Sequence, residues 1–465
     1  MNSPVLLASA LLAVQGLLIS PVTSAAPSIE QRQQEVRPLP GELDRVLMVN
    51  DNNPELIKGE GILLSTFPAK HSQNTAHKTS QSNLAVTLDG RFDLFSHHVY
   101  DGQKDEPDVT LWLAVLAQPL GNEPITLKLL AGSTSLSQAT TTGQTAAPFL
   151  PLPAVIAETT SAIAAGPGSR VAGDLLRGNQ ASELPNQWQL MPGSPSALIV
   201  LPIPVAGLDP LLNGRNLQMR LHSNGAIALA TLAGYGKGQE APSLQRWIEL
   251  LESGKLSAKE HTPTPRGSNG KIIYSRVSGI QVGSTWKAKI TDPGSSVLRL
   301  ANSPISWPIS SIERGRLGTG QVQTAELISH YQGTAWAAHG NYGVEYDLTL
   351  PLYNDSKHSK TMLLKIESPI KNDKNNTHLD FQSSTTGPVM FRGLIEVSGL
   401  DNKSSHDLGP QRFHLVLRKG QKGPNLGSVT ITPGQTRKLR VRLIYPADAT
   451  PPQVLTLLPV KQSNP

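Results

Sequence analysis

A glycine- and proline-containing turn, AGPGSR at residues 165–170, carries residue types that bind small anions. Gly166 and Gly168 flank a proline, and Ser169 and Arg170 follow at the predicted start of a helix. Backbone N–H groups at a helix N-terminus, the helix dipole and an arginine can together hold a phosphate or a carboxylate. A tight turn leading into a helix capped by Ser169 accounts for the same residues. The sequence leaves both interpretations open.

A second segment, residues 331–354, is the densest in polar and aromatic side chains. Its Trp336, His339, Tyr342 and Tyr346 predict a surface on which a sugar ring stacks. Only 5% of the chain is aromatic, which is low for a dedicated carbohydrate-binding protein. Packing of the same side chains in a core and its turns is the alternative interpretation.

Carboxylates are the next candidates, because a glycosidase needs two of them about 5–10 Å apart. Asp93, Asp101, Asp108, Glu313 and Glu345 are available for this role. The sequence does not indicate which of them converge, and it holds no GxSxG, HExxH, P-loop or GxGxxG motif. No catalytic residue is therefore assigned.

Metal chemistry has little support in the sequence. The chain has no cysteine, which excludes disulfides, thiolate nucleophiles and thiolate metal sites. The adjacent His97 and His98 would point to opposite faces of a strand and would not easily share a metal. The acidic loop at residues 100–108 lacks the spacing of an EF-hand. We therefore predict no metal site and no other cofactor.

The first 25 residues predict the cellular compartment of the protein. An apolar run over residues 5–19 is followed by small residues up to Ala25 and Ala26. This pattern is typical of a secretory signal peptide cleaved between those two alanines, and the run is short for a membrane span. Because residues 1–4 carry no lysine or arginine, a retained anchor is the alternative. We expect export to the periplasm, the cell surface or the medium, with no transmembrane span in the mature chain.

The charge balance suggests partners in that compartment. The chain has 41 Lys and Arg against 35 Asp and Glu, a net charge of +6 and a pI near 9.3. Such a balance favours acidic envelope polysaccharide, lipid headgroups or an envelope protein as partners, and export argues against nucleic acid. Because the basic residues are spread along the chain, a soluble surface without a dedicated partner is the simpler interpretation.

Short strands must position these groups. Charged residues make up only 16% of the chain, and Gly and Pro number 40 and 37 of 465 residues, a composition that favours strands and turns. We predict a mostly β fold with β-sandwich-like domains at residues 26–240 and 271–465. Residues 241–270 are predicted to hold a short connecting helix, over 242–254, and a linker. The stripe of Trp and Leu side chains on this helix is expected to dock between the domains. A second short helix is predicted over 169–178.

Eight segments, which run in order through nearly the whole mature chain, resemble known proteins. They are QEVRPLPGELD, GILLSTFP, GRFDLFSHH, AGPGSRVAGDLLRG, LNGRNLQMRLHSNG, ERGRLGTGQVQTA, AAHGNYGVEYDLTLPLYN and YPADATPPQVLTLLPV. Together they resemble secreted cyanobacterial proteins classed as a domain of unknown function. The resemblance implies a location in the bacterial envelope, and it implies no catalytic residue, cofactor or substrate.

The sequence as a whole predicts an exported, envelope-associated binding or structural protein. Its expected partner is acidic envelope polysaccharide or an envelope protein. One alternative is a hydrolase that acts on envelope polysaccharide. Another is an assembly or chaperone-like protein that uses an exposed strand edge.

Overall fold

The structure is a computed structural model, and it describes most of the chain after the predicted signal peptide. The described residues are 28–68, 82–106, 108–138, 155–157, 166–237, 240–270, 272–273, 275–384, 387–401 and 409–460. The predicted signal peptide at 1–25 and the cleavage site at Ala25 and Ala26 lie outside them. Strands dominate the described part, which confirms the mostly β fold.

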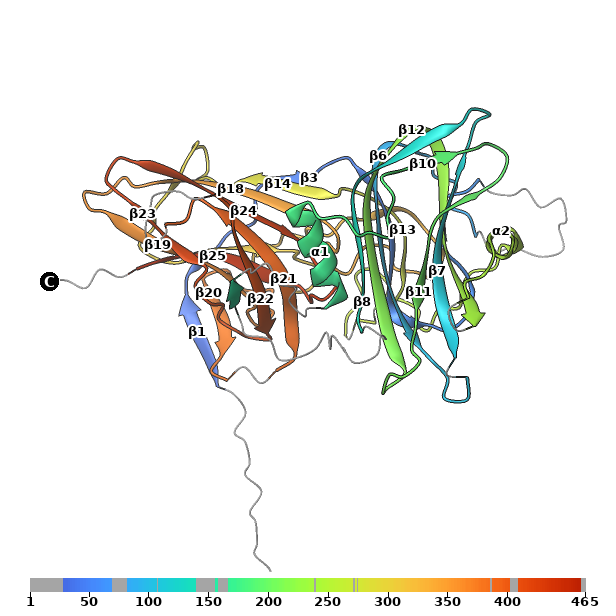
Figure 1. Ribbon diagram of the computed structural model, residues 1–465. Coiled ribbons are helices and arrows are strands. Elements are labelled where there is room, and N and C mark those ends of the chain that lie inside the picture. The colour runs from blue at the N-terminus through green and yellow to red at the C-terminus, as the bar shows by residue number, and fades with distance from the viewer. Residues whose placement is uncertain are drawn as a thin grey trace, which may run out of the picture.

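Two lobes lie side by side, and strand pairing defines them (Figure 1). The N-lobe is a ten-stranded sheet in the described part of the chain. It consists of β4 (Leu47–Ile57), β5 (Gly61–Ser65), β6 (Leu88–Asp101), β7 (Val109–Pro119), β8 (Ile125–Leu136), β10 (Gln187–Leu190), β11 (Ser196–Ile203), β12 (Leu212–Lys237), β13 (Val277–Val282) and β17 (Leu327–His330).

Strand β12 makes the N-lobe a sandwich, because its 26 residues belong to two layers. Its first part pairs with β6 and β8. After a register shift between Ser223 and Ile227, its second part pairs with β7 and β5. Met219 from the first part and Leu229 from the second are both fully buried in the core between the layers.

The C-lobe is a second sandwich, built from an eight-stranded and a five-stranded sheet. On strand β18 (Glu345–Tyr353), every second residue from Tyr346 to Leu352 points into the core, because side chains alternate between the two faces of a strand. The larger sheet consists of β3 (Glu42–Leu43), β9 (Val155–Ala157), β14 (Thr285–Lys289), β15 (Leu298–Arg299), β18 (Glu345–Tyr353), β21 (Val389–Ser398), β22 (Gln411–Arg418) and β24 (Thr436–Ile444). The smaller consists of β2 (Glu35–Val36), β16 (Ile305–Ile309), β19 (Lys360–Glu367), β23 (Gly427–Ile431) and β25 (Gln453–Pro459).

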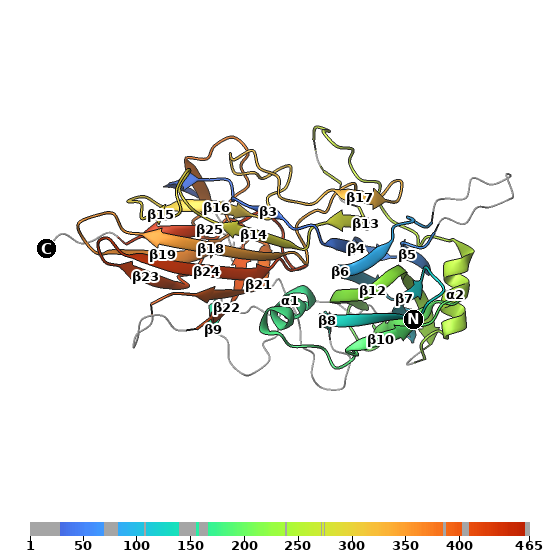
Figure 2. The same ribbon diagram turned by 90° about the horizontal axis from the view of Figure 1, so that it is seen from above.

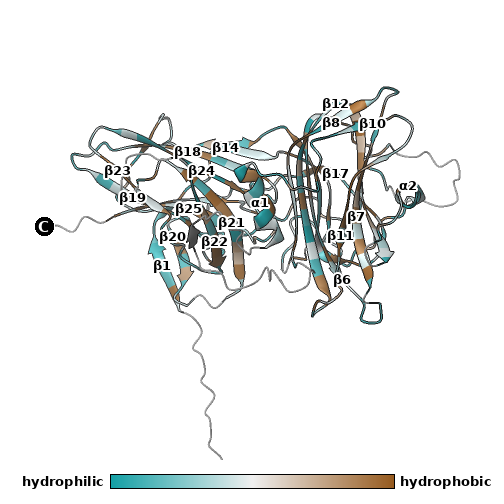
Figure 3. Cartoon of the chain, viewed as in Figure 1, coloured by the Kyte–Doolittle hydropathy of each residue, from teal (hydrophilic) through white to brown (hydrophobic). Residues whose placement is uncertain are grey.

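The lobes exchange strands along the sequence. The first strands of the chain pair within the C-lobe, since β2 pairs with β16 and β3 with β14, while β1 (Ile29–Gln33) pairs with β20 (His378–Gln382). Strands β13 and β17, which follow the predicted linker, belong to the N-lobe sheet. The chain therefore crosses between the lobes several times, and strands from both sides of residues 241–270 share sheets. Hydrophobic stretches follow the strands of both lobes, whereas β1 is hydrophilic (Figure 3).

Helix α1 (Pro167–Arg177) lies at the seam between the lobes (Figure 2). It contacts β8 and β12 of the N-lobe and β21 and β24 of the C-lobe. Its buried Val171 and Leu175 belong to one apolar cluster with Leu394 and Ile444 of the C-lobe. The helix ends at Gly178, in the left-handed conformation, as predicted.

Helix α2 (Leu244–Ser253) confirms the helix predicted over 242–254. The Ser243 side chain accepts a hydrogen bond from the Arg246 N–H, and Gly254 ends the helix. The expectation that it docks between the domains is wrong, because α2 packs on β12 and β5 at the side of the N-lobe that faces away from the C-lobe (Figure 1). Trp247 is fully buried there. Neither of the described helices is long and apolar enough to cross a membrane.

Replacement of Trp247 tests this docking. Trp247→Ala should lower the free energy of unfolding by about 3–5 kcal/mol, because it leaves a large cavity between α2 and the sheet. Leu244→Ala is the matched control on the same helix, since Leu244 is 45% exposed. Its effect should stay within about 0.5 kcal/mol. Urea unfolding of the mature protein measures both changes, and equal effects would contradict the docking.

Candidate functional site

A pocket of about 380 Å³ lies where three loops meet. The loops are residues 263–273, between α2 and β13; residues 312–324, which follow β16 of the C-lobe; and residues 335–339, which follow β17 of the N-lobe. We call this cavity the junction pocket, because two of its three loops, residues 312–324 and 335–339, pass between the lobes. It is the larger of the two described pockets considered below.

Trp336 forms an aromatic wall of the junction pocket and is half-buried. The guanidinium carbon of Arg266 lies 4.5 Å from the centroid of its ring, at a distance typical of a cation–π contact. Arg266 also pairs with Glu326 at 2.8 Å, and both of these side chains are more than 60% exposed. One face of the indole is therefore already covered by a cation.

Two further arginines line the pocket and fix its loops. Arg314 donates hydrogen bonds to the carbonyl oxygens of Ser268 and Gly270, and so ties two of the three loops together. The Arg316 Nε lies 3.7 Å from a carboxylate oxygen of Asp373. The same oxygen accepts the backbone N–H groups of Gly315 and Arg316 at 2.8 and 2.7 Å.

His339 lies in the pocket wall, with its Nε2 2.8 Å from the Ser275 carbonyl oxygen. Because burial lowers the pKa of His339, the ring is neutral at pH 7. Its Nε2–H then donates a hydrogen bond to the Ser275 carbonyl oxygen. The structure thus brings Trp336 and His339 to one cavity.

Tyr342 and Tyr346, the other two residues of the predicted sugar-stacking surface, contribute to the C-lobe core instead. Tyr346 is fully buried, and its hydroxyl accepts from Asn341 at 2.8 Å and donates to Gln323 at 3.0 Å. The ring of Tyr342 stacks on that of Phe95 with the centroids 6.5 Å apart. These two rings therefore pack in or against the core, as the alternative interpretation of this segment expects.

The predicted anion site at α1 holds a carboxylate of the chain itself. The Ser169 backbone N–H donates to Oδ2 of Asp448 at 2.7 Å. A Cβ placed on Gly166 would lie 2.3 Å from that oxygen, so the turn needs a glycine there. Gly166, rather than Ser169, is the N-cap, and the Ser169 hydroxyl donates to the Gly166 carbonyl.

The two remaining residues of that motif also have structural roles. A Cβ on Gly168 would lie 2.6 Å from the backbone nitrogen of Ala447, so the turn approaches the C-lobe backbone closely. Arg170 donates to the Leu136 carbonyl oxygen at the end of β8. The motif therefore joins the lobes, with Asp448 in the place of an external anion.

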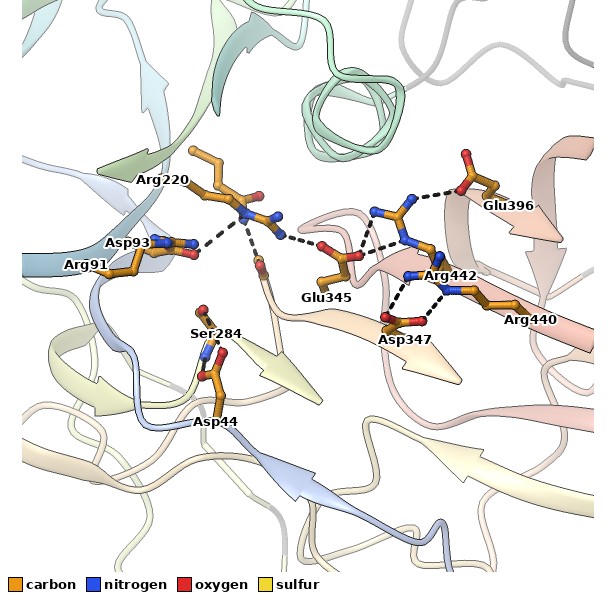
Figure 4. Close-up of polar contacts among 12 residues, drawn as sticks. Asp44, Arg91, Asp93, Arg220, Ser284, Glu345, Asp347, Glu396, Arg440 and Arg442 are labelled. Carbon is orange, nitrogen blue, oxygen red and sulfur yellow. Dashed lines mark hydrogen bonds and ion pairs between the residues drawn. The ribbon is translucent and has the colours of Figure 1, made fainter. Parts of the chain in front are cut away.

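A chain of ion pairs crosses the seam beside α1 (Figure 4). Arg220 on β12 of the N-lobe binds Glu345 on β18 of the C-lobe at 2.8 Å. Glu345 also binds Arg442 on β24 at 2.8 Å, and Arg442 continues to Glu396 on β21 at 2.8 Å. The side chains of Glu345 and Glu396 are each only 8% exposed, so these charges depend on one another.

Asp93 and Glu345 are two of the five carboxylates proposed for acid and base roles, and Arg220 brings them together. Arg220 Nε lies 3.9 Å from the fully buried Asp93, which also pairs with Arg91. Burial alone raises the pKa of Glu345, but the charges of Arg220 and Arg442 outweigh it and hold the pKa below its ordinary value. Glu345 is thus ionised, and it does not supply the neutral acid that a glycosidase needs.

The other three candidate carboxylates lie apart from this pair. Glu313 lines the junction pocket, and Asp101 lines a second, smaller pocket. Asp108 is exposed at the start of β7.

Sequence reasoning missed one group that could hold a metal, Glu55 with Glu260 and His261, because its members lie far apart in the chain. The Glu55 carboxylate accepts the backbone N–H groups of Glu260 and His261 at 2.6 and 3.1 Å. These hydrogen bonds explain the cluster as a carboxylate that fixes a turn. His98 is fully buried and lies 2.9 Å from Asp51 inside the N-lobe.

The Glu345 network predicts a specific pH dependence. Because the pKa of Glu345 is lowered on folding, its stabilising contribution is complete above its ordinary value of 4.5 and is lost as the pH falls through the lowered value. Glu345→Gln should cost about 3 kcal/mol at pH 7, since it removes the nearly buried charge that Arg220 and Arg442 share. This difference from the wild type should shrink as the pH falls from 6 towards 3. Urea unfolding across this range measures it, and a difference independent of pH would contradict the network.

The Asp448 contact can be tested separately. Asp448→Ala should lower the free energy of unfolding by about 1–3 kcal/mol, because the Ser169 N–H loses its acceptor. Asp448→Asn keeps an oxygen acceptor and should cost less. Thermal unfolding measures both changes, and an equal loss in the two variants would show that the helix terminus needs the charge rather than an oxygen acceptor.

A family model described as "Protein of unknown function (DUF3370)" matches residues 34–459, which include both lobes and the junction pocket. No curated protein matches the chain. The expected membership in a family of unknown function is confirmed: the chain belongs to the DUF3370 family.

Proposed function

We propose that this protein is exported, works in the cell envelope and binds an acidic saccharide in the junction pocket. The export half of the proposal rests on the apolar run and the small residues at positions 5–26. The binding half rests on the groups that line the pocket. The observation that carries it is the stack of Arg266 on Trp336 in the lining of the junction pocket.

The lining supplies each contact that a sugar ring requires. An indole packs against the apolar faces of sugar rings. Hydroxyl and amide groups exchange hydrogen bonds with sugar hydroxyls. Guanidinium groups bind carboxylates through two parallel hydrogen bonds. In the pocket these groups come from Trp336, from the three arginines, and from Thr264, Ser268, Asn269 and Thr324.

The charge of the lining favours an acidic ligand over a neutral one. Arg266, Arg314 and Arg316 face only two carboxylates, Glu313 and Asp373, among the described lining residues. Asp373 already accepts two backbone N–H groups, which stabilise its charge. The Arg266–Glu326 pair is exposed, and such pairs contribute little stability. A ligand carboxylate can therefore replace Glu326 on Arg266 at little cost.

The two alternative functions, a hydrolase and an assembly or chaperone-like protein, have less support. The convergent pair Asp93 and Glu345 is buried among arginines. Strand β17 ends the N-lobe sheet, but Leu327 on it donates its N–H to the Trp336 carbonyl at 3.1 Å, so a neighbouring segment occupies part of that edge.

A titration tests the binding. The mature protein should bind an oligogalacturonate about tenfold or more tightly than the methyl ester of the same oligosaccharide, because only the acid form pairs with the guanidinium groups. Arg266→Gln and Arg316→Gln should each remove most of this preference. Arg299→Gln is the matched control, since Arg299 is 52% exposed and pairs with aspartates on the surface outside the pocket. Equal affinity for acid and ester, measured by calorimetry, would contradict the proposal.

Export is tested in the native cell. The purified protein should begin at Ala26 by N-terminal sequencing and should occur in the envelope or the medium after cell fractionation. A cytoplasmic protein that keeps its first 25 residues would contradict this half of the proposal.

A further inference from the structure

A second pocket, of about 270 Å³, opens in the N-lobe. It lies where β4, β6 and β12 end and β7 begins. It shares no lining residue with the junction pocket. We call it the tyrosine pocket; its described lining is Ile57, Lys58, Tyr100, Asp101, Gln103, Glu106, Val109 and Tyr235.

Two tyrosine rings form its most distinctive feature. The centroids of Tyr100 and Tyr235 lie 6.1 Å apart, and the ring planes are tilted by 52°, so the rings form two walls at an angle. Tyr100 is held in place because it belongs to a buried apolar cluster with Ile57 and Leu111. Tyr235 is 39% exposed. The pocket thus has one fixed ring and one ring at its opening.

Carboxylates make this pocket negative. Asp101 and Glu106 belong to its lining. Burial first, and then the nearby Tyr235, Glu106 and Asp101, raise the pKa of Tyr100 to about 12. Burial, Glu60 and Glu106 also raise the pKa of Tyr235. Negative charge therefore lies near both rings.

The cation within the described lining, Lys58, forms an ion pair with a residue outside the pocket. Its Nζ lies 3.3 Å from a carboxylate oxygen of Glu260, which is outside the pocket. Asp101 and Glu106 thus lack a close basic partner in the lining, and they lie beside aromatic rings whose faces attract cations.

We propose that the tyrosine pocket binds a small organic cation, with a substituted ammonium group against the Tyr100 and Tyr235 rings and its charge balanced by Asp101 and Glu106. The volume suits a ligand of a few non-hydrogen atoms rather than a polymer. The proposal is independent of saccharide binding, because the two pockets share no residue and favour opposite charges.

Choline and 3,3-dimethylbutan-1-ol provide the probe pair, since they share a shape and differ in charge. The mature protein should bind choline at least about tenfold more tightly than the neutral alcohol, because only the cation gains from the rings and the carboxylates. Equal binding of the two probes, or no binding of choline at millimolar concentration, would overturn the proposal. Phosphatidylcholine vesicles form a second arm: retention on them identifies a lipid headgroup as the source of the cation, and binding of free choline alone identifies a soluble ligand.

Three variants connect the binding to the pocket. Tyr235→Leu and Glu106→Gln should each weaken choline binding by about tenfold or more. Both residues lie at the exposed side of the pocket, and an unchanged melting temperature would show that the variants fold. Asp108→Asn is the matched control, because Asp108 is exposed in the same loop but lies outside the lining. If the control loses as much binding as Glu106→Gln, general surface charge explains the effect and the proposal fails.

Discussion

The ionic contact between Arg220 and Glu345 is the interaction on which the arrangement of the two lobes depends. Glu345 is shared between an arginine of the N-lobe and Arg442 of the C-lobe, and its side chain is only 8% exposed. A shift of one lobe against the other would leave a nearly buried charge without its partner across the seam, which costs more than the pair adds to stability. The network therefore fixes how the lobes meet. Helix α1 acts at the same seam, since its N-terminus binds Asp448 of the C-lobe and its side chains contact both lobes.

This fixed seam also explains the junction pocket. The chain crosses between the lobes repeatedly, and two of the three loops around the pocket, residues 312–324 and 335–339, connect strands of different sheets. Arg314 ties one of these loops to another through backbone carbonyls. A cavity formed in this way has loops that are already held in place, so the rearrangement that binding requires is the loss of the exposed Arg266–Glu326 pair. The tyrosine pocket lies within the N-lobe alone and does not depend on the seam.

Local features of the fold follow from the sequence, whereas its long-range contacts do not. Ser243 and Gly254 bound α2 because capping depends only on adjacent residues. The pairing of the first strands with the C-lobe had no local signal, since strand partners are set by the whole core. At α1 the sequence allowed either an anion site or a structural turn, and the group at the turn is the carboxyl of Asp448, which is 279 residues from Ser169. Likewise, spacing alone could not separate Trp336, in a pocket wall, from Tyr346, in the core.

A crystal structure of the mature protein with an acidic oligosaccharide tests saccharide recognition in the junction pocket most directly. We expect a sugar carboxylate within hydrogen-bond distance of the Arg266 or Arg316 guanidinium, with Glu326 displaced from Arg266 and a sugar ring near Trp336. A saccharide bound at another surface, with the Arg266–Glu326 pair and the junction pocket unchanged, would contradict it.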